Sequence, residues 1–130
     1  MTPQRRVLLV DDELAVRQNL RAYLEDEGYL VDAAASAEEG KKLLDAAIGD
    51  DTGMPDYHAV IVDMRLPGMG GEEFIRQSSR CYPTLKFLIH TGSLEYLPSV
   101  DLLALGVGEQ SVIYKPLPDL SELSARLEQL

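Results

Sequence analysis

The chain has 130 residues, enough for one domain, which we expect to span residues 1–130, and its 12 basic and 22 acidic side chains give a net charge of −10. This balance excludes direct binding to nucleic acid, which needs a basic face, and favours a basic protein partner or a metal cation. We expect no secretory signal and no membrane insertion from the polar first residues, and the single cysteine, Cys81, excludes an internal disulfide and favours a cytoplasmic location.

The chain opens with a strand pattern followed by a helix pattern. Residues 7–10 form an unbroken aliphatic run, which is typical of a strand buried on both faces of a parallel sheet. Val16, Leu20 and Leu24 then repeat at helical spacing, and Gly28 stands where that helix would end.

A second strand and helix follow. Residues 29–34 predict a strand at a sheet edge, because the run contains the charged Asp32. Residues 36–39, Ser-Ala-Glu-Glu, have the form of a capping box and predict a helix that reaches Ala47. Residues 48–57 are rich in Gly, Asp and Pro, and we expect them to form a solvated surface loop.

The middle of the chain predicts two more buried strands with a helix between them. Residues 59–62 and 87–89 are the apolar runs of the two strands. Residues 71–80 predict the helix, with Phe74 and Ile75 turned inward.

The last part of the chain completes the alternation. Pro98 is expected in the first turn of a fourth helix that ends by Gly106. Residues 112–114 predict a fifth strand. A fifth helix is predicted by a stripe of leucines: Leu120, Leu123, Leu127 and Leu130. Five alternations of strand and helix predict an α/β fold, a doubly wound parallel sheet with helices on both faces.

Polar side chains follow four of the five predicted strands. They are Asp11, Asp12 and Glu13 after the first, Asp63 after the third, Thr91 after the fourth and Lys115 after the fifth. Parallel strands bring their carboxyl ends to one edge of the sheet, where ligand sites in such folds lie. Each aspartate alone is explained as a helix cap or a loop residue, but the combination predicts one site.

Phosphoryl transfer is the chemistry that fits this set. Crowded carboxylates repel one another unless a cation neutralises them, and Mg²⁺ is the intracellular cation that oxygen ligands favour. A carboxylate such as Asp63 can attack phosphorus to give an acyl phosphate. Mg²⁺, the Lys115 ammonium and the Thr91 hydroxyl would then balance charge on the transferring oxygens. A plain surface lysine and a helix-capping threonine are the alternatives, and capping can coexist with the site role.

Four segments resemble, in order and spacing, the motifs of response-regulator receiver domains of two-component signalling. They are Val-Leu-Leu-Val-Asp-Asp-Glu (7–13), Val-Ile-Val-Asp-Met-Arg-Leu-Pro-Gly-Met-Gly-Gly (60–71), Phe-Leu-Ile-His-Thr-Gly (87–92) and Ile-Tyr-Lys-Pro-Leu (113–117). The resemblance covers about residues 6–130. It implies a flavodoxin-like (βα)5 receiver fold with strand order 2-1-3-4-5, and a phosphoacceptor switch that is not a turnover enzyme on external substrates.

The resemblance also implies the ligands of the metal. Asp63 is implied as the phosphoacceptor and as a ligand of Mg²⁺. Asp12 is implied as a direct ligand, and Asp11 as a partner that acts largely through water. The backbone carbonyl of Arg65 is implied as a further ligand.

Further roles follow from the same motifs. Thr91 is implied as the switch hydroxyl that follows the phosphoryl group, and Lys115 as the lysine that pairs with it. The Lys115–Pro116 bond is expected to be cis, as is common in the family. Pro67 and Gly71 are expected to shape the loop after Asp63.

The chain departs from the family pattern at the switch. The aromatic residue usual three positions before the lysine is replaced by Val112, and we expect Tyr114 to lie on the opposite face of the strand from Val112. Arg65 and Ser93 occupy the positions that tune phosphoryl lifetime in the family. His90 ends a predicted strand, and His58 precedes one, so we expect both to be structural rather than phosphodonors.

The implied partners are a histidine kinase or a histidine phosphotransfer protein as donor. The implied output is an effector protein or a homodimer that contacts the face made by helix four, strand five and helix five. That face includes Leu94, Tyr96, Leu97 and the leucines of the final helix.

Three alternatives remain open at this point. A Mg²⁺-dependent phosphatase would carry an acid two residues after Asp63, where this chain has Arg65. A flavin-binding electron carrier would carry a phosphate loop after strand one, where this chain has acidic residues 11–13. The chain is either a stand-alone receiver or the N-terminal receiver of a larger response regulator.

Overall fold

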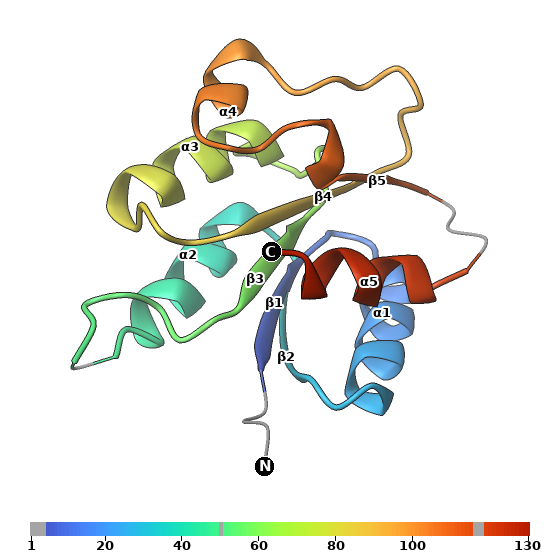
Figure 1. Ribbon diagram of the computed structural model, residues 1–130, viewed down its shortest axis with the longest axis horizontal. Coiled ribbons are helices and arrows are strands. Elements are labelled where there is room, and N and C mark those ends of the chain that lie inside the picture. The colour runs from blue at the N-terminus through green and yellow to red at the C-terminus, as the bar shows by residue number, and fades with distance from the viewer. Residues whose placement is uncertain (1–4, 50, 116–118) are drawn as a thin grey trace.

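The computed structural model describes residues 5–49, 51–115 and 119–130, and strands and helices alternate along them (Figure 1). The strands are β1 (Arg6–Val10), β2 (Leu30–Ala34), β3 (Ala59–Val62), β4 (Phe87–Thr91) and β5 (Val112–Tyr114). The helices are α1 (Leu14–Asp26), α2 (Ala37–Ala46), α3 (Gly71–Cys81), α4 (Val100–Ala104) and α5 (Ser121–Glu128), with a 3-10 turn at Glu109–Ser111. None of the helices in the described ranges has both the length and the apolar character needed to cross a bilayer. The expected cis bond before Pro116 lies outside the described residues.

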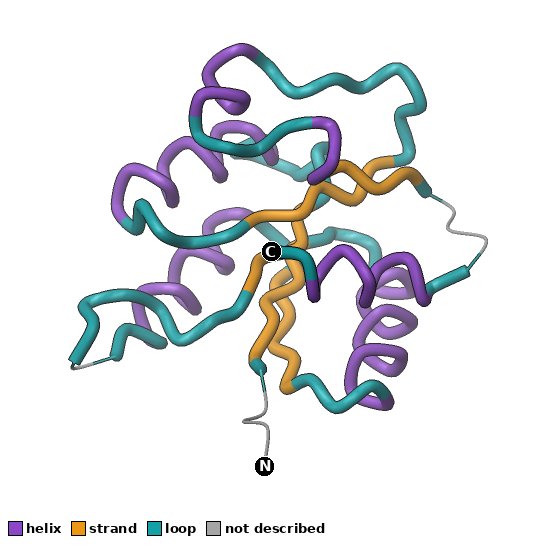
Figure 2. Tube along the Cα trace, viewed as in Figure 1, coloured by secondary structure: helices purple, strands orange, loops and turns teal. Residues whose placement is uncertain are grey.

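The five strands form one parallel sheet in the order β2-β1-β3-β4-β5, which confirms the implied fold. Figure 2 shows the strands at the centre, with helices on both sides. The edge position predicted for residues 29–34 is confirmed, since β2 pairs only with β1 among the described strands. Its charged Asp32 accepts a hydrogen bond from the Tyr57 hydroxyl at 2.7 Å and needs no place in the core.

Alternating strand residues build a separate apolar core on each face of the sheet. In β1, Leu8 and Val10 pack toward α2, α3 and α4, whereas Val7 and Leu9 pack toward α1 and α5. All four side chains are at most 1% exposed, as the unbroken aliphatic run predicted. Phe74, also predicted to face inward, is fully buried in the first core. Because helices cover both faces of the sheet, the ends of the strands are the part of the sheet where polar side chains can form a site.

The helix termini match most of the sequence signals. Ser36 caps α2 by accepting a hydrogen bond from the Glu39 backbone N–H at 3.1 Å, while the Glu39 carboxylate accepts one from the Ala35 N–H at 3.3 Å. Gly106, with a φ of +89°, follows the end of α4 as predicted. The placement of Pro98 was wrong: α4 begins at Val100, and Pro98 lies in the loop before it.

The loop at residues 48–57 is less solvated than the sequence predicted. Tyr57 is 9% exposed and belongs to the core beneath α2. Ile48 and Pro55 form an antiparallel bridge that closes the loop on itself. Ile48, Asp56 and the tip at residues 51–53 are the exposed residues of the loop among those described.

The start of α3 approaches the residues after β3 too closely for any side chain. A Cβ added to Gly71 would lie 2.5 Å from the Asp63 carbonyl oxygen and 2.9 Å from the Met64 Cα. Real Cβ atoms do not come this close to backbone, so a larger residue would push the α3 terminus away from Asp63. At Gly70 a Cβ would meet nothing within 4 Å.

We therefore predict that Gly71→Ala lowers the free energy of unfolding by about 1–3 kcal/mol, the usual cost of overpacking. Gly70→Ala is the matched control, and its cost should stay below about 1 kcal/mol because it alters only helix capping. Urea unfolding followed by circular dichroism measures both. Equal stability of the two variants would contradict the packing argument.

Candidate functional site

The backbone fixes the site residues by continuing the sheet one residue past each strand. The N–H of Asp11 donates to the Ala34 carbonyl at 3.1 Å, and the N–H of Asp63 donates to the Val10 carbonyl at 2.9 Å. The N–H of Lys115 donates to the Thr91 carbonyl at 2.7 Å. The strand ends of β1, β3 and β5 thereby deliver their side chains to the same edge of the sheet.

Four acids gather at this edge. Asp11, Asp12, Glu13 and Asp63 each offer a carboxylate oxygen, and these oxygens all lie within 4.8 Å of one another. Asp11 and Asp63 are 4% and 5% exposed, whereas Asp12 and Glu13 reach solvent. Like charges this close repel strongly, so the cluster has the donor set and the charge for a hard divalent cation. Glu13 was not among the predicted ligands, and its adjacency to Asp12 is the signal that could have included it.

Lys115 supplies the positive charge from β5. Its Nζ donates a hydrogen bond to Asp11 Oδ2 at 2.9 Å and lies 3.5 Å from Asp63 Oδ2. Burial by itself lowers the pKa of Lys115, but the hydrogen bond to Asp11 and the charges of Asp11 and Asp63 outweigh it and raise the pKa above its usual value. The side chain is therefore a fixed ammonium between two buried carboxylates.

The environment of Asp63 differs from that of an ordinary surface aspartate. The pKa of Asp63 lies above its usual value because burial outweighs the Lys115 charge and the hydrogen bond from the Arg65 N–H to Oδ1, at 3.3 Å, which both lower it. A nucleophilic carboxylate must be ionised, so the positive charges around it favour the reactive form. Asp63, Arg65 and Lys115 line one hollow, together with Asp12, Glu13 and Gly92.

Thr91 lies at the end of β4 but does not line this hollow. It is 1% exposed, and its Oγ1 accepts a hydrogen bond from the Ser93 N–H at 3.1 Å. The capping alternative is wrong for α4, whose N-cap position is Ser99. The next residue along the chain, Gly92, does line the hollow.

The prediction that Tyr114 lies on the opposite face of the strand from Val112 was wrong. In the register of β4 and β5, Val112 lies beside Ile89, and Tyr114 lies beside Thr91. Val112 and Tyr114 pack on the same sheet face, toward α2, α3 and α4. Residues two apart along a strand point to the same side, so the aromatic ring adjacent to Thr91 is that of Tyr114.

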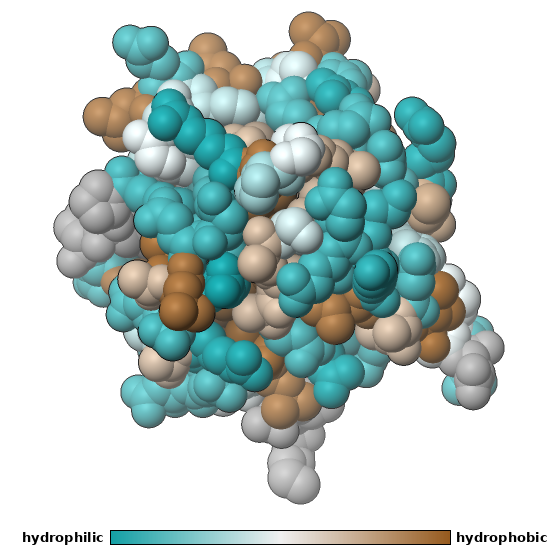
Figure 3. All heavy atoms as spheres, turned by 180° about the vertical axis from the view of Figure 1, so that it is seen from behind, coloured by the Kyte–Doolittle hydropathy of each residue, from teal (hydrophilic) through white to brown (hydrophobic). Residues whose placement is uncertain are grey.

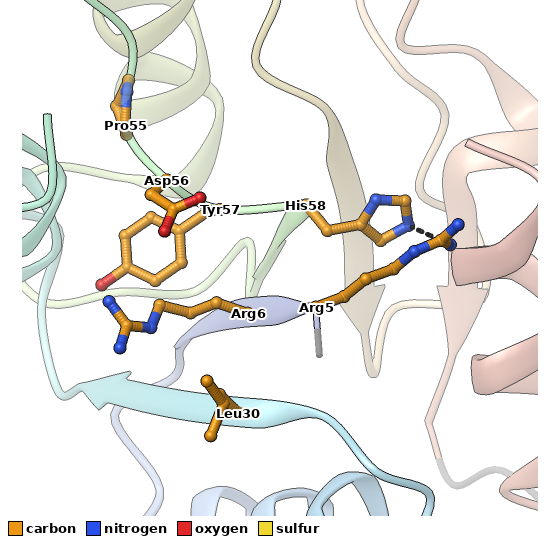
Figure 4. Close-up of a pocket in the computed structure, with 7 residues that line it drawn as sticks. All are labelled: Arg5, Arg6, Leu30, Pro55, Asp56, Tyr57 and His58. Atoms are coloured by element: carbon orange, nitrogen blue, oxygen red, sulfur yellow. Dashed lines mark hydrogen bonds between the residues drawn. The ribbon is translucent and has the colours of Figure 1, made fainter. Parts of the chain in front are cut away.

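A second hollow opens at the opposite, amino-terminal end of the strands (Figure 4). It is lined by Arg5, Arg6, Leu30, Pro55, Asp56, Tyr57 and His58. Its arginines already have acidic partners, Glu128 at 3.2 Å from Arg5 and Asp32 at 3.8 Å from Arg6. His58 Nε2 lies 2.7 Å from the Leu127 carbonyl oxygen, in keeping with the structural role expected for it.

The comparisons with known proteins agree with this geometry. The family model "Response regulator receiver domain" matches residues 7–128. The chain belongs to this family. It is 34% identical to the alginate biosynthesis transcriptional regulatory protein AlgB of Pseudomonas putida, over 98% of the chain and 29% of AlgB. It is also 34% identical to the response regulator MprA of Mycolicibacterium vanbaalenii, over 96% of the chain and 49% of MprA. The receiver thus spans about a third to a half of these relatives.

Solved receiver structures superpose over nearly the whole chain. A response regulator receiver protein from Pseudomonas putida gives a TM-score of 0.81 with 25% identity, and each chain is covered completely. The response regulator TrrA from Thermotoga maritima, in complex with Mg²⁺-BeF, gives 0.80 with 26% identity over 97% of this chain and 98% of TrrA. Receiver domains are signalling domains of two-component systems, and phosphorylation and Mg²⁺ are general features of the family. The phosphatase and flavin-carrier alternatives are thereby set aside.

His90 is a buried residue of β4 and is 5% exposed. Its ring nitrogen Nδ1 has no hydrogen-bond partner among the described residues. Burial, together with the positive charge of Lys115, lowers the pKa of His90 from 6.5 to about 4. This environment suits a neutral structural side chain.

The low pKa of His90 predicts a pH dependence of stability. Between pH 6.5 and about 4 the unfolded chain binds this proton more tightly than the folded one, so stability falls as pH is lowered through that window. His90→Asn should remove up to about 3 kcal/mol of this fall. The raised pKa of Asp63 changes stability with pH in the opposite direction, and this contribution is the same in the wild type and in His90→Asn. Urea unfolding of the wild type and His90→Asn at several pH values across this window tests the prediction. Parallel plots of stability against pH for the two proteins would contradict it.

Proposed function

We propose that Asp63 receives a phosphoryl group from a histidine kinase or a histidine phosphotransfer protein, in a Mg²⁺-dependent reaction. One observation carries the proposal: the Asp63 carboxylate is 5% exposed, yet it borders a hollow rimmed by Asp12 and Lys115. The acids and the ammonium that phosphoryl transfer needs therefore surround one nucleophile.

The donor set fits Mg²⁺. Asp12 and Asp63 would bind it directly, the backbone carbonyl of Arg65 would add a further oxygen, and Asp11 would act largely through water. When bound, the ion supplies positive charge against the phosphoryl oxygens. The Mg²⁺-BeF complex of TrrA, whose fold this chain shares, supports the same chemistry here.

In the proposed step a carboxylate oxygen of Asp63 attacks the phosphorus of a phosphohistidine. The new P–O bond forms as the P–N bond breaks, and the electron pair of that bond leaves with the donor imidazole. Lys115, 3.5 Å from Asp63 Oδ2, would move its ammonium onto the transferred oxygens. The Thr91 hydroxyl, now bonded to the Ser93 N–H, would turn to the same group.

We further propose that residues 1–130 form one receiver domain in the cytoplasm, where its kinase partners phosphorylate it. The family match over residues 7–128 and the single cysteine support this assignment. The net charge of −10 supports an output through protein contacts rather than through direct contact of this domain with nucleic acid.

Intact-mass spectrometry after incubation with acetyl phosphate and Mg²⁺ tests the acceptor. The wild-type protein should gain one phosphoryl group, and Asp63→Asn should gain none, because an amide cannot form the acyl phosphate. Asp26→Asn, an exposed acid on α1, is the control and should behave as wild type. Equal labelling of Asp63→Asn would place the acceptor elsewhere.

The output face is proposed to lie over α4 and the loop before it. Exposed apolar side chains gather there: Leu94 (76%), Leu97 (65%), Val100 (83%), Leu103 (51%) and Leu105 (49%). Figure 3 shows brown side chains projecting along the upper edge, where these segments lie. The expectation that the leucines of the final helix belong to this face was wrong for Leu123 and Leu127, which are buried in the core.

The negative charge of this face indicates which kind of partner would bind it. Residues 92–111 contain three acids, Glu95, Asp101 and Glu109, and no lysine or arginine. Asp101 is paired with Arg76 of α3, but no basic partner is seen for Glu95 or Glu109 among the described residues. Two copies of the face would bring these acids together, so an effector with apolar residues flanked by lysine or arginine fits better than a homodimer.

An amphipathic peptide of leucine and lysine, compared with its leucine and glutamate counterpart, tests this preference. Only the lysine peptide should shift the amide resonances of residues 94–105. The double variant Val100→Ser, Leu103→Ser should bind this peptide more weakly. Leu30→Ser, which removes an exposed leucine from β2, should not. Dimerisation through α4 in sedimentation experiments, or equal binding of both peptides, would overturn the choice of partner.

A further inference from the structure

Tyr114 links the receiver site to the loop that precedes α4. It is the β5 neighbour of Thr91 in the sheet register, and it directly precedes Lys115. Its hydroxyl donates a hydrogen bond to the Tyr96 carbonyl oxygen at 3.0 Å. A residue that touches the switch position thus also holds a point in the middle of the β4–α4 loop.

Tyr96 extends the connection to α3. Its hydroxyl donates to Glu72 Oε2 at 2.7 Å, and its ring packs against the apolar core. Burial, and the hydrogen bond to Glu72, raise the pKa of Tyr96, so this hydroxyl remains a donor at physiological pH. The loop is consequently held at Tyr96 from two sides. The backbone carbonyl of Tyr96 is bonded to β5, and its side-chain hydroxyl is bonded to α3.

Glu72 and Arg76 carry the connection from α3 to α4. The second carboxylate oxygen of Glu72 accepts from Arg76 Nη2 at 2.9 Å. Arg76 also bonds the Asp101 carboxylate in α4 and the Ser99 hydroxyl at the α4 N-cap, the latter at 3.3 Å. An unbroken series of hydrogen bonds therefore runs from β5 to the helix that carries the exposed apolar face.

We propose that this series, from Tyr114 through Tyr96, Glu72 and Arg76 to Asp101, couples the state of Asp63 to the position of α4. The inference rests on the proposed function, since it assumes that Thr91 responds to a phosphoryl group on Asp63. Val112 occupies the usual aromatic position but is a buried aliphatic residue without a hydroxyl. Tyr114, two residues closer to the site along β5, supplies the aromatic ring and the hydrogen bond that Val112 lacks.

The geometry explains how a small movement would be transmitted. Thr91 and Tyr114 are adjacent on paired strands, and the Lys115 N–H is bonded to the Thr91 carbonyl. A shift of Thr91 changes the space beside the Tyr114 ring, which carries the Tyr96 backbone with it. Because Arg76 holds both Glu72 and Asp101, the loop and α4 respond together rather than separately.

Deletion of single hydroxyl groups tests the coupling. Beryllofluoride with Mg²⁺ is added to the wild-type chain, and amide resonances are followed at residues 63 and 115 and across α4. In Tyr114→Phe and Tyr96→Phe the site resonances should still shift as in wild type, whereas the α4 resonances should lose most of their shift. The double variant should resemble either single variant, because both hydroxyls act in one series.

Tyr23→Phe is the matched control. Its hydroxyl is 3.0 Å from Ser124 Oγ, on the opposite face of the sheet, and its loss should leave both sets of shifts unchanged. Undiminished α4 shifts in both Tyr114→Phe and Tyr96→Phe would overturn the coupling while leaving the acceptor role intact. A wild-type chain without site shifts would instead overturn the proposed function itself.

Discussion

The parallel register of β1, β3 and β5 is the constraint on which the site depends. It brings the residues after these strands to one edge, so that two nearly buried carboxylates, Asp11 and Asp63, share a single ammonium from Lys115. Excess negative charge in a place with little water is costly, and a divalent cation relieves it. Four of the 22 acidic side chains of the chain thus lie together where a metal ion and phosphoryl chemistry can use them.

The two apolar cores hold this arrangement in place. Helices cover both faces of the sheet, and α3 starts against the Asp63 backbone at Gly71. The proposed response to phosphorylation starts at the sheet edge and leaves it through the β4–α4 loop and α3. Thr91 and Tyr114 lie side by side there, and the β4–α4 loop begins at the same point.

Much of the fold and the site could be predicted because their signals are local. Unbroken apolar runs predicted the buried strands, and the polar residues after four of the five strands predicted the site. The wrong predictions concern a contact between distant segments and the face of a strand to which a side chain points. Tyr57 enters the core because it meets Asp32, 25 residues away, and no local pattern reports this contact. Tyr114 was assigned to the wrong face, although alternation along β5 was sufficient to place it.

A crystal structure grown with Mg²⁺ and beryllofluoride tests the central claim most directly. The account predicts beryllium on an Asp63 oxygen, Mg²⁺ held by Asp63, Asp12 and the Arg65 carbonyl, and the Lys115 ammonium turned from Asp11 toward a fluoride. A metal bound elsewhere, or Asp63 free of beryllium with Lys115 still on Asp11, would contradict it.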